Sequence, residues 1–506
     1  MRGPSHPVRW RVSVSAAALL LALIGGAAVA PAHEPASQPT RRLKVLLVVF
    51  DGLRPDHVTP ALTPRLHDVA TAGVRSTRHH SLFPTVTRVN ASALATGAGP
   101  AGHGILDNSI YLPDVDSMRA LDTGNGKVMM HADSVLGGRL LTAPALASRL
   151  RAAGMRLMVA SAGSSGSAYL FAGGAGVPTV NPELFLPAAL GPAVTRLVGP
   201  VPDDASPNLG RNAWAVDALL RVGIDSLDVD VGYLWLSDPD HTAHGTGLGS
   251  IMADSSIRAA DREFGRLLDG LTTRGLAGRV NIMVVSDHGF STHAGDAGAL
   301  RARLGEFGDR VVVAGGAVYV RRGGTTVRDQ VLRRLRQSAD VGAIFTRSVR
   351  GRATASGTVP MELIGWEHPR ASDMLFSADW SHDANGAGHP GTTRQSGVAG
   401  HGTTSPWDIS ATFVAAGPAF RVRDRAPLPS SNADIVPTIL HLLGQPATPT
   451  GVQGRPLLEL LRESSATPPV AMRDSTSALD EHTRTVLYRT RVGAHWYVDS
   501  TRTIRR

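Results

Sequence analysis

The sequence predicts an α/β fold with a mostly parallel central sheet, helices on both faces and a smaller inserted subdomain. The chain has 506 residues, of which 42% are hydrophobic, so it can bury a large core. Short β-rich apolar runs alternate with segments of helical period along the chain. Because these runs are apolar throughout, they are typical of parallel strands that are covered on both faces.

The expected elements begin at residue 44. Strands are predicted at residues 44–50, 156–160, 231–237, 280–285 and 411–415, and helices at 142–154, around 257–271 and at 432–444. The helix at 142–154 is bounded by a capping threonine and an early proline at one end and by glycine at the other. The strand at 231–237, the helix after it and the strand at 280–285 form a βαβ unit.

The chain divides into four parts. Residues 1–32 read as a secretory signal, 33–42 as a polar linker, 43–462 as the main domain and 463–506 as an extension to which the sequence assigns no role. Within the main domain, an insertion is expected at about 296–391. It is predicted to hold strands at 311–313 and 317–320 and a helix near 327–337.

The amino terminus has the order of charges and apolar residues found in a cleavable signal peptide. Arg2, Arg9 and Arg11 precede an uncharged apolar run centred on residues 16–24, and small residues follow at 28–32. An uncleaved membrane anchor is the alternative, which the short apolar centre disfavours. Cysteine is absent, so disulfides, thiolate metal ligands and a lipoprotein anchor are excluded. We expect an exported protein without a stable membrane anchor after cleavage.

The formal charge of +9 comes almost wholly from arginine, since Lys44 and Lys127 are the only lysines. A positive potential can attract substrates that carry phosphate. The arginines are scattered, however, and no basic run with interleaved aromatic residues indicates a nucleic-acid surface. The sequence makes no prediction of the oligomeric state.

Three predicted strands end in an acid. Asp51 follows the strand at 44–50, Asp240 follows the strand at 231–237, and Asp287 follows the strand at 280–285. The carboxyl ends of parallel strands lie along one edge of a sheet, where ligands bind. An Asp-Gly pair such as that at Asp51 is by itself also a common turn.

Three histidines make a binding site the better interpretation. His244 lies four residues after Asp240, His288 is adjacent to Asp287, and His401 lies between two glycines. A mixture of carboxylates and imidazoles suits borderline divalent cations, zinc above all. Six ligands are too many for one tetrahedral zinc, so two metal ions are expected. Paired metal ions in proteins serve the hydrolysis of phosphate esters.

Seven short motifs resemble the alkaline phosphatase superfamily and, within it, the nucleotide pyrophosphatase/phosphodiesterase (type I phosphodiesterase) group. They are Phe-Asp-Gly-x-Arg at 50–54, Pro-Thr-x-Thr at 84–87, Thr-Gly at 96–97, His-Gly-Ile-x-x-Asn at 103–108, Pro-Asp-x-x-x-His at 239–244, Ser-Asp-His-Gly at 286–289 and Gly-His-Gly at 400–402. The resemblance runs from about residue 44 to 444, in the family's order. It implies an alkaline phosphatase-like fold.

The resemblance also implies a role for each matching residue. It assigns the ligands of one metal ion to Asp51, Thr87, Asp287 and His288, and those of the other to Asp240, His244 and His401. Thr87 is implied as the nucleophile, because a metal ion can lower the pKa of its hydroxyl and a phospho-threonine can then be hydrolysed. Asn108 is implied as a donor to a phosphoryl oxygen. An ordinary loop or helix-capping threonine is the alternative for Thr87.

The chain departs from the family pattern directly after the nucleophile. Members that cleave nucleotides place an aromatic residue there, whereas this chain has Arg88. Arg88 cannot stack on a base in the same way, but it can bind a second anionic group of the substrate. Preference for nucleotides is therefore not predicted.

Two other groups of the superfamily fit less well. The stretch at 128–130 resembles phosphonoacetate hydrolases, but the lysines that those enzymes carry after the strand at 156–160 are missing from residues 161–167. Sulfatases need a cysteine or serine in Cys/Ser-x-Pro-x-Arg, and here cysteine is absent and the proline after Ser81 comes one place late.

The predicted function is thus a secreted hydrolase with two metal ions, which cleaves phosphodiester or pyrophosphate bonds in a small-molecule phosphate ester. A phosphomonoesterase is the main alternative; a phosphonate hydrolase and a non-catalytic metal-binding protein are weaker ones. Six further histidines match no role in the family and are interpreted as surface or hydrogen-bonded structural residues: His57, His79, His80, His103, His382 and His389.

Overall fold

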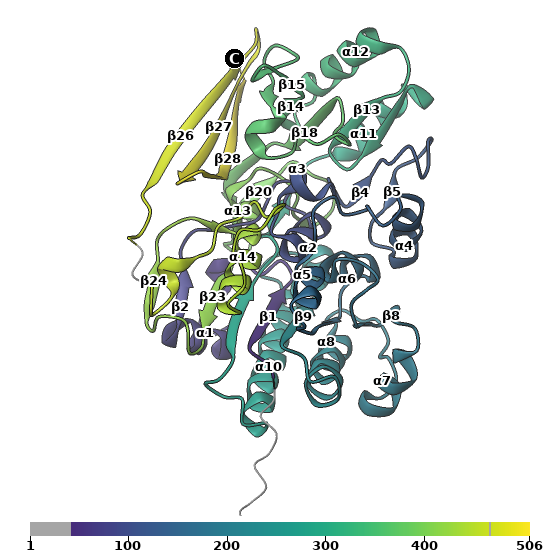
Figure 1. Ribbon diagram of the computed structural model, residues 1–506. Helices are drawn as coiled ribbons and strands as arrows, with labels where there is room; N and C mark the ends of the chain where they lie inside the picture. Colours follow the sequence, from purple (N-terminus) through teal and green to yellow (C-terminus); the bar gives the residue numbers. More distant parts are fainter. Residues whose placement is uncertain (1–41, 465–466, 506) are drawn as a thin grey trace, which may run out of the picture. The chain divides into compact units, whose positions relative to one another are not determined.

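A nine-stranded sheet forms the centre of the fold, in the order β24-β2-β23-β10-β1-β9-β6-β7-β8 (Figure 1). The computed structural model describes residues 42–464 and 467–505, which belong to the unit Arg41–Arg506. The strands of the sheet are β1 (Val45–Phe50), β2 (Val74–Ser76), β6 (Leu157–Ser161), β7 (Thr179–Asn181), β8 (Leu184–Leu186), β9 (Val231–Leu236), β10 (Asn281–Val285), β23 (Phe413–Ala416) and β24 (Asp424–Ala426). The signal peptide predicted at 1–32 lies outside the described residues.

The middle of this sheet is parallel. The neighbouring strands β10, β1, β9, β6 and β7 all pair in parallel, while β8 and β23 add antiparallel partners. Strand β1 is central because all six of its residues are apolar and fully buried, with β9 on one side and β10 on the other. The predicted α/β fold with a mostly parallel sheet is confirmed.

Alternate residues of β1 enter two separate cores, one on each face of the sheet. Leu46, Val48 and Phe50 pack against one set of helices, and the intervening valine and leucine side chains pack against the other. The first face is covered by α1 (Pro64–Ala72), α7 (Leu190–Val198), α8 (Leu209–Asp217), the π-helix Ala218–Ser226 and α10 (Ile251–Thr273). The second face is covered by α2 (Thr87–Thr96), α5 (Leu146–Ala152), α6 (Ser165–Ala172) and α14 (Ile435–Leu442).

The long helix α10 follows from its sequence. Ser250 caps it by accepting a hydrogen bond from the amide of Ala253. Its apolar positions recur at the helical period and are buried against the sheet, as predicted for residues 257–271. Among the described residues, none of the helices has the length and apolar character needed to cross a bilayer.

Two predicted boundaries are wrong. Helix α5 begins at Leu146 rather than at Thr142, because the residue before Pro144 is disfavoured in the helical conformation and the Thr142 hydroxyl donates to the carbonyl of Gly102 (2.6 Å). The helix predicted at 432–444 begins as a 3-10 turn, Asn432–Asp434, and its capping box is formed by Ser431 and Asp434.

The strand predicted at 411–415 is split at Thr412. Strand β22 (Ser410–Ala411) pairs with β3 (His79–His80), whereas β23 pairs with β10. The Thr412 amide donates to the side chain of Ser286 (2.7 Å), and its hydroxyl donates to the carbonyl of Leu53 (2.8 Å). Thr412 therefore holds the ends of β1 and β10 together.

The region of the predicted insertion contains a second sheet, in the order β12-β13-β18-β14-β17. Its elements are α11 (Ala297–Gly305), β12 (Val311–Ala314), β13 (Ala317–Val320), α12 (Gly324–Arg336), β14 (Val341–Thr346), β17 (Val359–Pro360) and β18 (Met374–Ala378). The chain then enters a four-stranded sheet made of β11 (Ser291–His293), β19 (Trp380–Ala384), β20 (Pro390–Thr393) and β21 (Ala399–Gly400). Its strand β21 directly precedes His401 in the chain.

The carboxyl-terminal residues, which the sequence left without a role, form a three-stranded antiparallel sheet (Figure 1). Its strands are β26 (Ala471–Leu479), β27 (Thr483–Val492) and β28 (His495–Arg505). Leu487 packs in a core shared with Phe83 and Trp366, and the buried Tyr497 hydroxyl donates to Asp434 (3.0 Å). The sheet is therefore packed against the elements that precede it.

The core on the α10 side of the sheet gives a first prediction. Phe264 is fully buried on α10, with its ring edge-to-face against Phe50 of β1 at 5.8 Å. We expect Phe264→Ala to lower the free energy of unfolding by about 3–5 kcal/mol, because it removes this contact and leaves a cavity. Urea unfolding followed by circular dichroism measures the change. The exposed Arg262→Ala on the same helix is the control and should stay within about 0.5 kcal/mol of wild type; equal loss in both variants contradicts the prediction.

Candidate active site

The acids at the ends of β1, β9 and β10 meet at one edge of the sheet. Asp51 directly follows β1, Asp287 lies two residues after β10, and Asp240 begins α9 (Asp240–Thr246). The Asp240 amide donates to the carbonyl of Asp51 (3.1 Å), and the Gly52 amide donates to Asp287 Oδ1 (3.1 Å). Gly52 has φ +69°, and a Cβ there would lie 3.1 Å from Asp240 Cβ, so glycine is needed for this turn.

One group of candidate metal ligands surrounds His288. Its Nε2 lies 3.1 Å from Asp287 Oδ2, 3.4 Å from Asp51 Oδ1 and 3.3 Å from Thr87 Oγ1. All four residues are buried. The structure thus brings together the four residues that the sequence assigns to one metal ion.

The second group surrounds Asp240. Its Oδ1 lies 3.1 Å from His244 Nε2 and 3.2 Å from His401 Nε2. The two groups adjoin, because the rings of His288 and His401 stack at 3.4 Å between centroids and His288 Nε2 lies 3.9 Å from Asp240 Oδ1. All seven predicted ligands therefore form one continuous cluster.

Backbone carbonyls fix the orientation of the three imidazoles. Each Nδ1 faces a carbonyl oxygen: that of Ala399 for His244 (3.0 Å), that of Gly289 for His288 (2.9 Å) and that of Thr85 for His401 (2.8 Å). For His288 and His401, Nδ1 carries the proton that is donated to the carbonyl, which leaves the Nε2 lone pairs facing the carboxylates. His244 differs, because the charge of Asp240 raises its pKa to about 9, so its protonated Nε2 also donates to Asp240 when no metal ion is bound. Acceptors that face acceptors at 3.1–3.4 Å around His288 fit a cluster built to hold cations.

The carboxylates show the same pattern. One oxygen of Asp51 accepts from the indole N–H of Trp235 (2.9 Å), and one oxygen of Asp287 accepts from Gly52. Asp51 Oδ1 and Asp287 Oδ2 are buried without a hydrogen-bond donor among the described residues. Buried oxygens without donors are costly, and divalent ions bound among them would remove that cost.

Burial and mutual repulsion raise the pKa of two acids of the cluster. For Asp240 burial acts in the same sense, but the imidazoles of His244 and His401 outweigh it and hold the pKa well below its usual range. Desolvation, together with the charge of Asp240, raises the pKa of Asp287 to about 7. Desolvation and the charges of Asp287 and Asp240 raise the pKa of Asp51 well above its usual range. The ionised form of both acids is therefore disfavoured when no metal ion is bound.

Thr87 and Asn108 lie beside this cluster. Thr87 is the first residue of α2. The side-chain oxygen of Asn108 accepts from the amide of Arg88 (3.0 Å), so its NH₂ group remains to donate to a ligand. The Arg88 guanidinium reaches across to the Ser164 hydroxyl (3.2 Å).

A cavity of about 240 Å³ opens from the cluster. Asp51, Thr87, Arg88 and Asp240 line its inner end. The remaining lining is almost wholly polar: Ala162, Gly163, Ser164, Ser167, Glu183, Asp204, Asn208, Arg211, Ser237 and His241. Among the described residues that line it, none is Phe, Tyr or Trp, so the cavity offers no such ring for stacking on a base.

Sequence reasoning missed two residues that position the cluster. Trp235 orients Asp51 by donating to its side chain. The available signal was a tryptophan, with an N–H that needs a partner, in a buried strand. Asn432, read as the start of a helix, donates to the carbonyl of Asp287 (2.8 Å) and to the side chain of Asn90 (3.0 Å). It therefore connects the loop that carries Asp287 to helix α2 at Asn90, three residues after Thr87.

The six histidines without a predicted role lie outside the two groups of ligands. His79 is fully buried between Ser430 and Asn432, and His80 pairs with Asp499. The remaining four each have a hydrogen-bond partner: His57 with His389, His103 with the amide of Ile105, and His382 with the indole of Trp407.

A mostly parallel sheet with helices on both faces and with acids and histidines at one edge is the arrangement that the sequence predicted. The type I phosphodiesterase / nucleotide pyrophosphatase family matches residues 45–403, and the chain belongs to this family. The predicted family is confirmed.

Curated relatives match only part of their own length. Ectonucleotide pyrophosphatase/phosphodiesterase family member 3 of Mus musculus is 24% identical over 266 residues, which cover 52% of this chain and 26% of the relative. Venom phosphodiesterase 2 of Crotalus adamanteus is 25% identical over 247 residues, 48% of this chain and 26% of the relative. Family member 7 of Homo sapiens is 27% identical over 310 residues, 58% of this chain and 56% of the relative.

Two solved structures share the fold. Murine ectonucleotide pyrophosphatase/phosphodiesterase 5 in complex with AMP has a TM-score of 0.58 at 20% identity, and covers 83% of this chain and 100% of its own. Alkaline phosphatase PafA has a TM-score of 0.65 at 16% identity, and covers 84% and 100%.

The raised pKa of Asp287 gives a second prediction. A carboxyl whose pKa is about 7 in the folded protein and about 3.9 unfolded destabilises the fold as pH rises between these values. In chelator, Asp287→Asn should therefore match wild type near pH 4 and become more stable than wild type by pH 8. Urea unfolding at several pH values measures this difference, with the exposed Asp203→Asn as control. A variant that is no more stable than wild type at pH 8 contradicts the prediction.

Proposed function

We propose that the protein hydrolyses phosphodiester or pyrophosphate bonds with two divalent metal ions, most simply zinc, and with Thr87 as nucleophile. The observation that carries the proposal is the continuous cluster of seven candidate ligands, in which Thr87 Oγ1 lies 3.3 Å from His288 Nε2. Three carboxylates and three imidazoles suit zinc. The names of the relatives, which are phosphodiesterases and nucleotide pyrophosphatases, support the same reaction.

Asp51, Thr87, Asp287 and His288 would hold one ion, and Asp240, His244 and His401 the other. When bound, the two ions supply positive charge that lowers the pKa of the Thr87 hydroxyl and stabilises the charge that develops on the phosphoryl group. The Thr87 oxygen attacks phosphorus, and the ester or pyrophosphate oxygen on the far side leaves. Water then hydrolyses the phospho-threonine and restores Thr87.

Asn108 and Arg88 are proposed to hold the substrate. The NH₂ group of Asn108 is the one left free by the hydrogen bond from the Arg88 amide, and it would donate to a phosphoryl oxygen. The Arg88 side chain lies at the inner end of the polar cavity, where its guanidinium would pair with a further anionic group of the substrate.

The charges of the cavity favour a diester over a monoester. Arg211 is already paired with Asp204 (3.2 Å), which leaves Arg88 as the cation nearest to Thr87 among the lining residues. Glu183 adds a negative charge to the wall. A monoester dianion needs more positive charge than a diester monoanion, so we place the phosphomonoesterase second.

We also propose that the protein is exported. The charge pattern and apolar run of residues 1–32 are those of a signal peptide. The similarity to venom phosphodiesterases supports the proposal that the protein acts outside the cell. It would then meet its small-molecule substrate after export.

A third prediction tests the nucleophile. We expect Thr87→Ala to keep the fold and two equivalents of zinc but to lose about 10³-fold or more in rate on bis(4-nitrophenyl) phosphate, because the attacking oxygen is gone. Thr87→Ser keeps a hydroxyl and should retain measurable turnover. Initial rates, circular dichroism and metal analysis of the three proteins make the comparison. Full activity in the alanine variant would rule out the proposed mechanism.

A fourth prediction concerns the kind of ester. The wild-type enzyme should show a higher kcat/KM on bis(4-nitrophenyl) phosphate than on 4-nitrophenyl phosphate. Arg88→Ala should weaken diesters that carry an extra anionic group more than diesters with a neutral tail, since only the former pair with the guanidinium. Steady-state kinetics on matched substrates measures both ratios, with Arg262→Ala as control. A higher kcat/KM on the monoester in the wild type overturns the diesterase assignment. It does not contradict the proposal that two metal ions and Thr87 carry out the reaction.

A further inference from the structure

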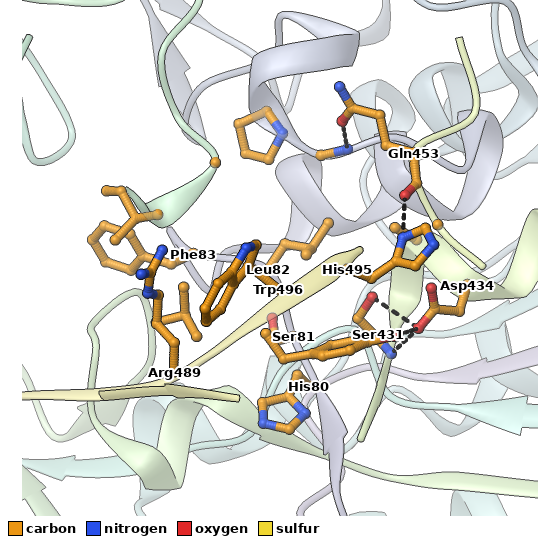
Figure 2. Close-up of a pocket in the computed structure, with 18 of the residues that line it drawn as sticks. His80, Ser81, Leu82, Phe83, Ser431, Asp434, Gln453, Arg489, His495 and Trp496 are labelled. Atoms are coloured by element: carbon orange, nitrogen blue, oxygen red, sulfur yellow. Dashed lines mark hydrogen bonds between the residues drawn. The ribbon is translucent and has the colours of Figure 1, made fainter. Parts of the chain in front are cut away.

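A second cavity, of about 280 Å³, lies outside the catalytic site, between the carboxyl-terminal sheet and the segment that precedes helix α2 (Figure 2). Its walls come from residues 80–83, 99–100, 362–365, 431, 433–434, 453–454 and 494–498, together with Arg489. None of the seven candidate metal ligands lines it. About half of the wall follows residue 403, where the family match ends.

Trp496 forms one wall and is held in place. Arg489 lies over its ring, with Cζ 4.1 Å from the ring centroid. Arg489 is itself fixed by hydrogen bonds to the carbonyl of Leu363 (3.3 Å) and to Asp474 (2.8 Å). Trp496 is nevertheless 45% exposed, so part of the indole remains available to a ligand. A rigid, accessible indole is suited to stacking on a flat ring.

Three polar groups border the same space. The Ser81 hydroxyl is buried, with the residue 2% exposed, and has no hydrogen-bond partner among the described residues. His495 uses Nδ1 on the carbonyl of Gln453 (3.0 Å), which leaves Nε2 as an acceptor. The Gln453 side-chain oxygen accepts from the Gly99 amide (2.9 Å), which leaves its NH₂ group as a donor. Figure 2 shows Ser81, Trp496 and His495 around this space.

The charged groups of the wall already have hydrogen-bond partners within the protein. Arg489 donates to Asp474, Asp434 accepts from the Arg455 amide (2.8 Å) and from Tyr497, and Glu362 accepts from Ser348 (2.8 Å). The remaining wall is mostly apolar, with Leu82, Phe83, Pro100, Leu363, Ile364 and Val498.

We propose that this cavity binds a flat, uncharged heteroaromatic ring, stacked on Trp496 and hydrogen-bonded to Ser81. An apolar slot with a few convergent polar groups is the usual form of a small-molecule site. A sugar would bring more hydroxyl groups than three polar partners can satisfy, whereas a ring of the size of indole or a nucleobase carries few polar atoms. This binding is separate from the proposed hydrolysis.

Indole is the probe that tests the proposal, with titration calorimetry on the full chain. Wild type should bind indole more tightly than 1-methylindole, because only indole can donate to the Ser81 oxygen. Trp496→Ala should weaken indole binding by about tenfold or more through loss of stacking. Ser81→Ala should remove the difference between indole and 1-methylindole.

Two controls separate this site from other surfaces and from catalysis. Tyr488→Ala removes a 43% exposed aromatic residue of the same sheet that does not line the cavity, and it should bind indole like wild type. Thr87→Ala should also bind indole unchanged, whatever its activity. Equal indole affinity in Trp496→Ala and wild type overturns the proposal, as does binding of methyl glucoside in place of indole.

Discussion

The repulsion among three carboxylates at one sheet edge is the constraint on which the rest of the site depends. Asp51, Asp240 and Asp287 are held together by backbone hydrogen bonds that cross from one strand end to the next. Burial and the neighbouring acids make the charges of Asp51 and Asp287 costly and raise the pKa of Asp287 to about 7, whereas His244 and His401 stabilise the charge of Asp240. The fold imposes this cost, because the parallel strands on either side of β1 bring the acids to the same edge of the sheet. Such a cost is typical of functional sites rather than of structural cores.

The surroundings of these acids fix which of their atoms face one another. Each imidazole turns its Nδ1 to a backbone carbonyl, and Trp235 binds the outer oxygen of Asp51. Asn432 then connects the loop of Asp287 to Asn90 of helix α2, the helix that begins at Thr87. Positioning of this kind determines how well a reactive oxygen is aligned.

The carboxyl-terminal sheet extends this arrangement away from the sheet edge. Tyr497 donates to Asp434, the residue that closes the capping box next to Asn432. The sheet also covers Phe83, four residues before Thr87. A segment that the sequence left without a role is thus packed against two chain segments next to the proposed site, and the cavity beside Trp496 lies at that junction.

The sequence by itself determined the fold class, the family and the identity of the candidate ligands, because apolar strand runs and the acids that end them are local patterns. It placed α10 within its observed limits, since a helical period is carried by neighbouring residues. Only the tertiary structure decided the break at Thr412, the late start of α5 and the roles of Trp235 and Asn432. Each depends on hydrogen bonds between residues far apart in the chain, such as Thr412 to Leu53 and Asn432 to Asn90. The three carboxyl-terminal strands were missed for a related reason. Strand β26 exposes much of its surface and β27 mixes polar with apolar residues although it is largely buried, so neither carries an apolar run. Their pairing and the contact of this sheet with Phe83 and Asp434 are set by the fold.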